Sequence, residues 1–244
     1  MAVNRNLSAV DQESQPYFRP AIVVMAKVPS AGSVKTRLRP FLTEIQCESL
    51  AVCFLHDIIA NTLSIIDDVF VAYYPTDAGD SMVGFCDERA TLIKQIGDDL
   101  GERLDAVVSE VGRRGFSPVL VIGSDSPTLP DSTVITAVNA FIEPAVDLIL
   151  GPTEDGGYYL IGIREPVSYI FNRIDWSTER VYRQTIARAK EAGLDDIVEL
   201  PPWYDVDVPA DLIRLDRDVR SNSDSEKEIP ETYRWLLGNR SLFE

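Results

Sequence analysis

The sequence predicts an α/β protein of three layers, in which helices cover both faces of a mostly parallel β-sheet. Three observations support this fold class. Short apolar runs alternate along the 244 residues with segments of helical periodicity. The first of these runs, residues 21–26, is apolar throughout, as expected for a parallel strand that is buried on both faces. Several of the segments that follow such runs also begin with residues that typically start helices.

The predicted strands are the apolar runs at residues 21–27, 69–74, 91–95, 119–122, 147–150, 158–163 and 197–200. The segments that predict helices lie at about 43–66, 80–89, 100–114, 131–142, 178–192, 209–218 and 232–237. Thr43 and Gln46 have the spacing of a capping box, and Pro130 followed by Asp131 marks the start of the fourth helix. A Gly-Gly segment instead of a helix joins the runs 147–150 and 158–163, so we expect an antiparallel or crossing strand there.

We expect one domain over residues 20–244, preceded by a polar N-terminal tail over residues 1–19. That tail lacks the apolar segment of a secretory signal. No internal repeat is visible, and no convincing linker precedes Ser221. Residues 220–228 are polar and rich in serine, which predicts a loop before the closing helix.

The formal net charge of −16 restricts the partners of the protein, because a surface of that sign repels the phosphate backbone of nucleic acids. A small nucleotide complexed with a metal is still compatible, since it needs only a local pocket. No apolar run approaches the roughly 20 residues that cross a bilayer, so we expect no membrane span. The three cysteines have neither metal-binding spacing nor an even count, which favours the reducing cytoplasm. The sequence leaves a homodimer open.

The first candidate site is a basic segment that contrasts with the acidic chain. No acidic residue lies between Gln15 and Thr43, whereas this segment contains Lys27, Lys35 and Arg37. It follows the first predicted strand, and a loop at the carboxyl end of that strand is where open α/β sheets bind phosphates. We therefore expect a bound anion there; the alternative is a solvated basic loop beside the strand.

Two acidic segments are candidates for a cation site. Asp125 directly follows the buried run 119–122 and Gly123-Ser124, where a carboxylate suits a divalent cation that bridges nucleotide phosphates. The alternative is that it only organises the turn or caps the next helix. Asp205 and Asp207 alternate in a segment that reads as extended, so their side chains would share a face. The alternative for Asp207 is that it only leads into the helix begun by Pro209.

A further segment, residues 151–159, combines acids with paired glycines. Gly156 and Gly157 let the backbone approach a ligand closely, and Glu154 and Asp155 beside them could contact sugar hydroxyls, a metal or an attacking group. Hairpin geometry explains the Asp-Gly pair equally well. Residues 95–103 could line the same crevice or form a plain loop and helix start. We expect His56 to be packed rather than catalytic.

Taken together, these blocks resemble the nucleotide-diphospho-sugar transferase superfamily, which has a GT-A-like, Rossmann-related fold. The segment 25–38 resembles its opening loop, and the segments 123–127, 154–159 and 205–209 resemble further blocks in the same order. The resemblance covers roughly residues 20–215 and is closest to a small bacterial branch of glycosyltransferase-like domains, formerly a domain of unknown function. The chain departs from sugar nucleotidyltransferases in having only Gly32 in its opening loop. It also lacks an Asp-x-Asp motif directly after the central strand.

The resemblance implies a nucleotide bound over the first loop. Its contacts would come from Lys27, Gly32, Lys35, Arg37 and Ser124, with Lys35 and Arg37 near the phosphates. It also implies that Asp125 and Asp207 hold Mg²⁺ or Mn²⁺.

The favoured hypothesis is a metal-dependent transferase that uses a nucleotide-diphospho-sugar donor and a small-molecule acceptor. Glu154 or Asp155 would orient or deprotonate the acceptor hydroxyl. A first alternative is a nucleotidyltransferase that moves a nucleoside monophosphate from an NTP to a phosphorylated small molecule. A second alternative is a nucleotide-binding module without catalytic activity.

Overall fold

The computed structural model describes residues 18–167 and 169–244, so most of the predicted tail lies outside the described residues. Within them, seven strands form one sheet in the order β3-β2-β1-β4-β6-β5-β7. The strands are β1 (Ala21–Lys27), β2 (Val69–Tyr74), β3 (Thr91–Lys94), β4 (Val119–Gly123), β5 (Leu148–Pro152), β6 (Tyr158–Ile163) and β7 (Ile197–Glu199). The helices are α1 (Glu44–Ile65), α2 (Gly79–Val83), α3 (Leu100–Arg113), α4 (Asp131–Ala140), α5 (Val181–Glu191), α6 (Pro209–Ser221), α7 (Ser225–Glu228) and α8 (Pro230–Gly238).

The sheet is mostly parallel, as the sequence predicts, and the exception falls where the Gly-Gly segment predicts it. Strand β6 pairs antiparallel with β4 on one side and with β5 on the other. The remaining pairs, β1 with β2 and β4, β2 with β3, and β5 with β7, are parallel. The turn between β5 and β6 therefore lies at the same edge of the sheet as the carboxyl ends of β1 and β4.

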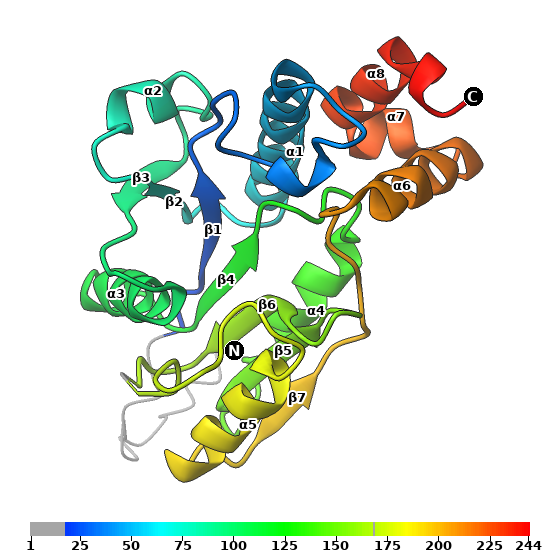
Figure 1. Ribbon diagram of the computed structural model, residues 1–244. Coiled ribbons are helices and arrows are strands. Elements are labelled where there is room, and N and C mark those ends of the chain that lie inside the picture. The colour runs from blue at the N-terminus through cyan, green and yellow to red at the C-terminus, as the bar shows by residue number, and fades with distance from the viewer. Residues whose placement is uncertain (1–17, 168) are drawn as a thin grey trace, which may run out of the picture.

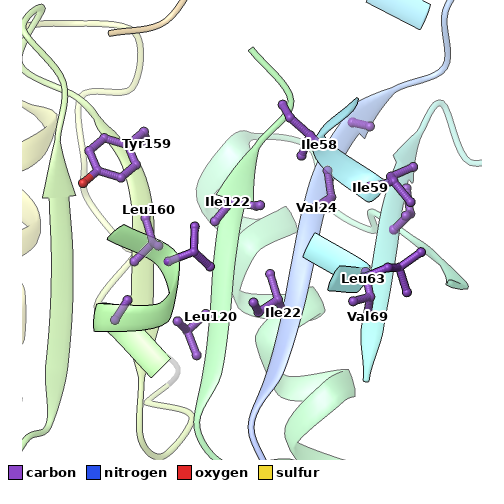
Figure 2. Packing of buried hydrophobic residues seen from close by; sticks show 14 of the residues in the cluster. Ile22, Val24, Ile58, Ile59, Leu63, Val69, Leu120, Ile122, Tyr159 and Leu160 are labelled. Atoms are coloured by element: carbon purple, nitrogen blue, oxygen red, sulfur yellow. The ribbon is translucent and has the colours of Figure 1, made fainter. Parts of the chain in front are cut away.

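Helices cover both faces of this sheet, which confirms the three layers (Figure 1). On one face, Ile22 and Val24 of β1 pack with Ile58 and Ile59 of α1, and residues of α4 extend the same cluster. Figure 2 shows this packing, with Leu120 of β4 in the neighbouring strand. The alternate residues of β1 face α3 and α5 on the other side. The unbroken apolar run of β1 is thus required by burial on two faces.

A third apolar cluster anchors the first loop to the C-terminal helices. Leu38 and Leu42, which follow β1, are buried against Phe54 of α1 and against Leu212 and Trp235 of the C-terminal helices. Figure 1 shows α6, α7 and α8 gathered beside α1. The loop after β1 is therefore held at its far end by apolar contacts, which fixes its basic residues over the edge of the sheet.

Helix α1 has the length and apolar composition that would allow a membrane crossing, and it alone does so among the described residues. Its apolar side chains contribute to two of the three buried clusters. The composition of α1 is thus accounted for by its central place in the core, where a helix is apolar on more than one face.

The elements differ from the predicted ones mainly at their ends. Helix α2 stops at Val83, because the chain turns at Gly84 and packs Phe85 against the core instead of continuing the predicted helix to residue 89. Helix α6 continues to Ser221, and α7 lies in the segment predicted as a loop. Arg19, assigned to the tail, forms a β-bridge with Ser117.

Candidate active site

The candidate site lies where the carboxyl ends of β1 and β4 meet. These strands are neighbours in parallel register, with Met25 beside Gly123. From β1 the chain continues to β2 and β3 on one side of β1, whereas β4 lies on its other side. The direction in which successive strands are added to the sheet therefore reverses between β1 and β4. Crevices at such reversals bind ligands in open α/β sheets. The loops that follow both strands therefore converge on one position.

The loop after β1 has a backbone that Gly32 makes possible. Gly32 has a φ of +79°, an angle that residues with a side chain rarely adopt. A Cβ there would lie 2.8 Å from the guanidinium of Arg39. The Gly32 carbonyl accepts a hydrogen bond from that guanidinium at 2.8 Å, and Arg39 also pairs with Glu44 at the start of α1. The backbone angle and these contacts give the glycine a part in shaping the loop.

Lys35 connects this loop to both predicted metal ligands. Its ammonium lies 2.6 Å from Asp125 Oδ1 and 3.8 Å from Asp207 Oδ1, and it donates a hydrogen bond to the Val206 carbonyl at 2.8 Å. Its side chain is only 5% exposed and passes over the ring of Phe54 at 5.1 Å. The structure therefore brings together the three predicted residues, although the Lys35 ammonium contacts carboxylates directly.

Arg37 remains open to solvent on the same loop, two residues further on. Its side chain is 67% exposed and reaches Asp207 Oδ2 at 3.3 Å. Burial and the neighbouring charge of Asp125 raise the pKa of Asp207, while the charges of Lys35 and Arg37 lower it. Arg37 can therefore exchange its contact with Asp207 for a contact with a bound anion at little cost, because exposed ion pairs contribute little.

The segment before α6 is fastened to the end of β4. The Val206 amide donates to the Asp125 carbonyl at 2.9 Å, and Ser126 Oγ donates a short hydrogen bond to Asp205 Oδ1. Burial raises the pKa of Asp205 to about 6, and the carboxylates of Asp125 and Asp207 add to this rise. As predicted from their alternation, Asp205 and Asp207 border the same cavity.

Two cavities meet at this position and differ in charge. The first, of about 540 Å³, is called the basic cavity below. Among the described residues, its charged lining consists of Lys27, Lys35, Arg37, Arg103, Asp125 and Asp207. Ser124 also lines it, so the residues implied for nucleotide binding, other than Gly32, gather there.

The second cavity, of about 420 Å³, is called the apolar cavity below. It extends from the basic cavity along the sheet face that α3 covers and is lined by Leu104, Val121 and Ile161. The two cavities share several lining residues, among them Arg37 and Asp207. A ligand in one cavity can therefore reach a ligand in the other beside this arginine and this carboxylate.

The two predicted catalytic acids point to different places. Asp155 borders the apolar cavity, and its Oδ1 accepts hydrogen bonds from Thr153 Oγ1 at 2.6 Å and from the Gly157 amide at 3.2 Å. Glu154 is not among the residues that border either cavity. It accepts two hydrogen bonds from Arg214 of α6, at 2.7 and 3.1 Å, and these hold its pKa below the usual range.

Other residues at the site had weaker signals in the sequence. Gln95, at the end of β3, borders the basic cavity and donates to the carbonyls of Ala26 and Ala72. A glutamine directly after an apolar strand is the only signal for this role. Ser177, between Trp176 and α5, borders both cavities with a φ of +64°. Nothing local in the sequence indicates that backbone conformation.

The donor chemistry at the site fits a divalent cation. Asp125 and Asp207 supply hard carboxylate oxygens on side chains that are 46% and 39% exposed. Among the described residues, no group of three or more His, Cys, Asp or Glu is placed to hold a metal. Mg²⁺ in nucleotide sites is usually held by one or two carboxylates, with phosphates and water supplying the rest. Two converging carboxylates beside a basic cavity match that arrangement.

Comparison with known proteins supports the fold. A family described as an uncharacterised protein conserved in bacteria (DUF2064) matches residues 62–178. A structure of a proposed nucleotide-diphospho-sugar transferase from Desulfovibrio desulfuricans G20 is 30% identical, with a TM-score of 0.85, covering 93% of this chain and 97% of that one. No curated protein shows significant sequence similarity.

More distant structures share the fold alone. CMP:2-keto-3-deoxy-manno-octonic acid synthetase complexed with CTP is 15% identical, with a TM-score of 0.56, covering 83% of this chain and 98% of that one. A cytidylyltransferase from Leptospira borgpetersenii serovar Hardjo-bovis is 12% identical, with a TM-score of 0.57, covering 93% of this chain and 97% of that one.

The sheet order, the converging loops and the similarity to the Desulfovibrio protein define a protein of the nucleotide-sugar transferase kind. The chain belongs to the nucleotide-diphospho-sugar transferase superfamily.

Proposed function

We propose that the protein is a metal-dependent transferase that takes a glycosyl group from a nucleotide-diphospho-sugar and passes it to a small-molecule acceptor. The observation that carries this proposal is the meeting of two unlike cavities beside Arg37 and Asp207. The basic cavity suits a nucleoside diphosphate, and the apolar cavity offers a separate place for an acceptor. A transfer reaction needs both substrates to meet at one point.

The basic side chains have distinct parts in this proposal. Lys27, Arg37 and Arg103 border the cavity from different segments and are placed to contact the diphosphate. Arg37 lies where the cavities join, so it would neutralise negative charge as the nucleoside diphosphate leaves. Lys35 is buried against Asp125 and would hold the two carboxylates in position, acting on the phosphates only through them.

Asp125 and Asp207 would hold the Mg²⁺ or Mn²⁺ ion. When bound, such an ion polarises the diphosphate and offsets its charge. The chain itself prepares this position, because Lys35 draws both carboxylates together and the Val206 amide fixes the Asp125 backbone.

Asp155 is the candidate for the group that takes the proton from the acceptor. Its Oδ1 is engaged by Thr153 and Gly157, which orients the carboxylate at the border of the apolar cavity. Oδ2 is left to accept a hydrogen bond from an acceptor hydroxyl. Positioned general bases of this kind typically contribute about 10²–10⁴-fold to the rate.

The charge of the apolar cavity favours glycosyl transfer over the nucleotidyl-transfer alternative. Among the described residues, its charged lining is Asp155, Glu179, Asp205 and Asp207 against Arg37. A nucleotidyltransferase would have to bring a phosphorylated acceptor to Asp155, Glu179 and Asp205, which the proposed cation on Asp207 does not pair with, and like charges in a partly enclosed cavity repel. The distant cytidylyltransferase structures share the fold, and fold alone does not select the reaction.

The test combines binding with product analysis. Thermal melting is measured with UDP-, GDP-, CDP- and ADP-sugars and with the four NTPs, each with and without Mn²⁺, because ligands that bind the native state raise the Tm. We expect metal-dependent stabilisation by one sugar nucleotide above its parent NTP, and release of free nucleoside diphosphate when an acceptor is added. Pyrophosphate release from an NTP would instead establish nucleotidyl transfer.

A matched pair of variants tests the metal ligand. Asp125→Asn should lose the Mn²⁺-dependent part of nucleotide binding, whereas Asp77→Asn, the same change at an exposed position outside both cavities, should keep it. Equal metal dependence in both variants would remove Asp125 from the site. Binding without any turnover, unchanged by Asp155→Asn, would point to the non-catalytic module.

A further inference from the structure

The lining of the apolar cavity indicates what kind of acceptor it takes. We infer that the acceptor is an uncharged hydroxyl compound with an apolar body, an aliphatic or aromatic alcohol rather than a phosphorylated molecule. This inference rests on the proposed transferase function and concerns only the second substrate.

The deep wall of the cavity is made of core side chains. Leu104 of α3, Val121 of β4, Ile161 of β6 and Val181 of α5 border it, and each is between 1% and 6% exposed. The first three come from the cluster that packs the α3 face of the sheet. The cavity is therefore an opening in the hydrophobic core, and a ligand body that fills it must be apolar to gain from the burial.

An aromatic side chain completes this wall. Trp176 borders the cavity and packs edge to face against Tyr158, with ring centroids 6.5 Å apart. Its indole also lies close to Gly101, where an added Cβ would approach the ring nitrogen to 2.7 Å. The ring is thus held against α3 and presents a rigid apolar surface to the ligand, as aromatic side chains do in many binding sites.

Three of the hydroxyl groups that border the cavity are already engaged within the protein. Of the threonines that border the cavity, Thr153 donates its hydroxyl hydrogen to Asp155, and Thr178 donates its own to the Asp175 carbonyl. The Tyr159 hydroxyl donates to the Pro201 carbonyl. Asp155 is placed to accept a hydrogen bond from the acceptor hydroxyl, because its Oδ1 is already engaged and its Oδ2 is left for the ligand.

The charges at the opening exclude an anionic acceptor. Besides Asp207, which is assigned to the cation, Asp155, Glu179 and Asp205 border this cavity, and Arg37, the one basic residue in its described lining, is placed for the donor diphosphate. An acceptor carrying a phosphate or carboxylate would therefore meet net repulsion. The preferred acceptor is neutral, with its one hydroxyl directed to Asp155 and its body inserted toward Leu104.

Three probe ligands distinguish the effect of an apolar body on binding from the effect of a negative charge. Isothermal titration of the full chain compares 2-naphthol, 2-naphthyl phosphate and myo-inositol, each added to protein saturated with Mn²⁺ and with the nucleoside diphosphate of the sugar nucleotide that stabilises it most, because this nucleotide has no glycosyl group to transfer. We expect 2-naphthol to bind at least tenfold more tightly than 2-naphthyl phosphate, and myo-inositol to show no binding. Tighter binding of either 2-naphthyl phosphate or myo-inositol than of 2-naphthol would overturn the inference.

Two leucine variants locate the binding. Leu104→Gln adds a polar group to the cavity wall and should weaken 2-naphthol binding about tenfold while leaving nucleotide affinity unchanged. Leu63→Gln makes the same change at a buried position of α1 on the opposite face of the sheet and should leave 2-naphthol affinity as it is. An equal effect of both variants would overturn the assignment to this cavity. If the unmodified chain binds no nucleotide at all, in contrast, that result would count against the proposed function itself.

Discussion

The ammonium of Lys35 lies 2.6 Å from the carboxylate of Asp125, and the lysine side chain is almost fully shielded from solvent. Lys35 has left-handed backbone angles, with φ 49° and ψ 35°, which cost an ordinary residue about 1–2 kcal/mol. The contacts of its ammonium with Asp125, Val206 and Asp207 offset that strain. Lys35 therefore joins three segments that are distant in sequence and sets the spacing of the two acids.

This role predicts that Lys35 contributes more to stability than Arg37 does. Lys35→Met should lower the free energy of unfolding by about 1–3 kcal/mol, because it leaves neighbouring carboxylates without their counter-ion. Arg37→Met should cost less than about 1 kcal/mol, since its pair with Asp207 is exposed. Urea unfolding measures both changes, and a larger cost for Arg37→Met would contradict this assignment.

For nucleotide affinity at saturating Mn²⁺ the order of these two variants should be reversed, with the larger loss in Arg37→Met. Arg37→Met should weaken metal-dependent nucleotide binding about tenfold, because it removes a charge that borders both cavities. Lys35→Met should change the concentration of Mn²⁺ needed for binding more than the affinity at saturating Mn²⁺. Titrations of nucleotide at several Mn²⁺ concentrations separate the two effects; identical behaviour of the variants would reject separate roles.

The two neighbouring acids of the turn between β5 and β6 should differ in catalysis. Asp155→Asn keeps an oxygen for the bonds from Thr153 and Gly157 but removes the basic oxygen, so we expect kcat to fall about 10²-fold or more. Glu154→Gln should change kcat by no more than about threefold, because Glu154 pairs with Arg214 away from both cavities. Steady-state rates of glycosyl transfer test this ranking, and a larger loss in Glu154→Gln would reverse the assignment.

The elements of this fold are readable from the sequence because their signals are local. The run 21–26 is apolar at every position and faces helices on both sides, and Thr43 caps α1 with Gln46 as their spacing predicts. The order of the strands is not local, since it depends on which way each crossover connection turns. Likewise, α2 is shorter than predicted because tertiary contacts of Phe85 override the helical pattern.

The residues of the candidate site could be predicted from the sequence, but their arrangement in space could not. Lys35, Asp125 and Asp207 each follow from a loop that leaves a strand or precedes a helix, but their mutual contact depends on how the loops fold together. Glu154 and Asp155 are equivalent in sequence. What separates them is Arg214, which lies 60 residues further along the chain. No pattern around residue 154 indicates that partner.

Two glycines with nearly equal φ angles allow a direct test of the packing at this site. Gly156 has a φ of +91° and Gly115 a φ of +89°, but an added Cβ would lie 2.3 Å from the Glu179 carbonyl oxygen at Gly156 and would have no neighbour within 4 Å at Gly115. Gly115→Ala should therefore cost about 1–2 kcal/mol from the backbone angle alone.

Gly156→Ala should cost about 1–3 kcal/mol more, because the turn and the segment before α5 must move apart. The Gly156 carbonyl accepts a hydrogen bond from the Tyr182 amide at 2.9 Å, so this displacement also disturbs the start of α5. Urea unfolding gives the two values, with Gly115→Ala as the control for conformation. Equal losses in the two variants would show that the contact with Glu179 is easily relieved.

Asp57 should make stability depend on pH in a region away from the site. This aspartate of α1 is 1% exposed and accepts hydrogen bonds from the amides of Glu231 and Thr232, at 3.0 and 2.8 Å, in the first turn of α8. Burial raises the pKa of Asp57, and the hydrogen bonds from Thr232 and Glu231 oppose that rise without cancelling it. The folded protein thus binds this proton more tightly than the unfolded chain does.

The sign of the pH effect follows from this difference in proton affinity. The contribution of Asp57 to stability is greatest below the ordinary aspartate pKa and falls as the pH rises toward the raised value of the folded state. Asp57→Asn cannot titrate, so the stability of the unmodified protein relative to this variant should fall over the same interval. Asp57→Ala leaves two amides without an acceptor and should cost about 1–3 kcal/mol. Urea unfolding between pH 4 and pH 8 measures both, with the exposed Asp77→Asn as control; a relative stability that rises with pH would show that the hydrogen bonds from α8 outweigh burial.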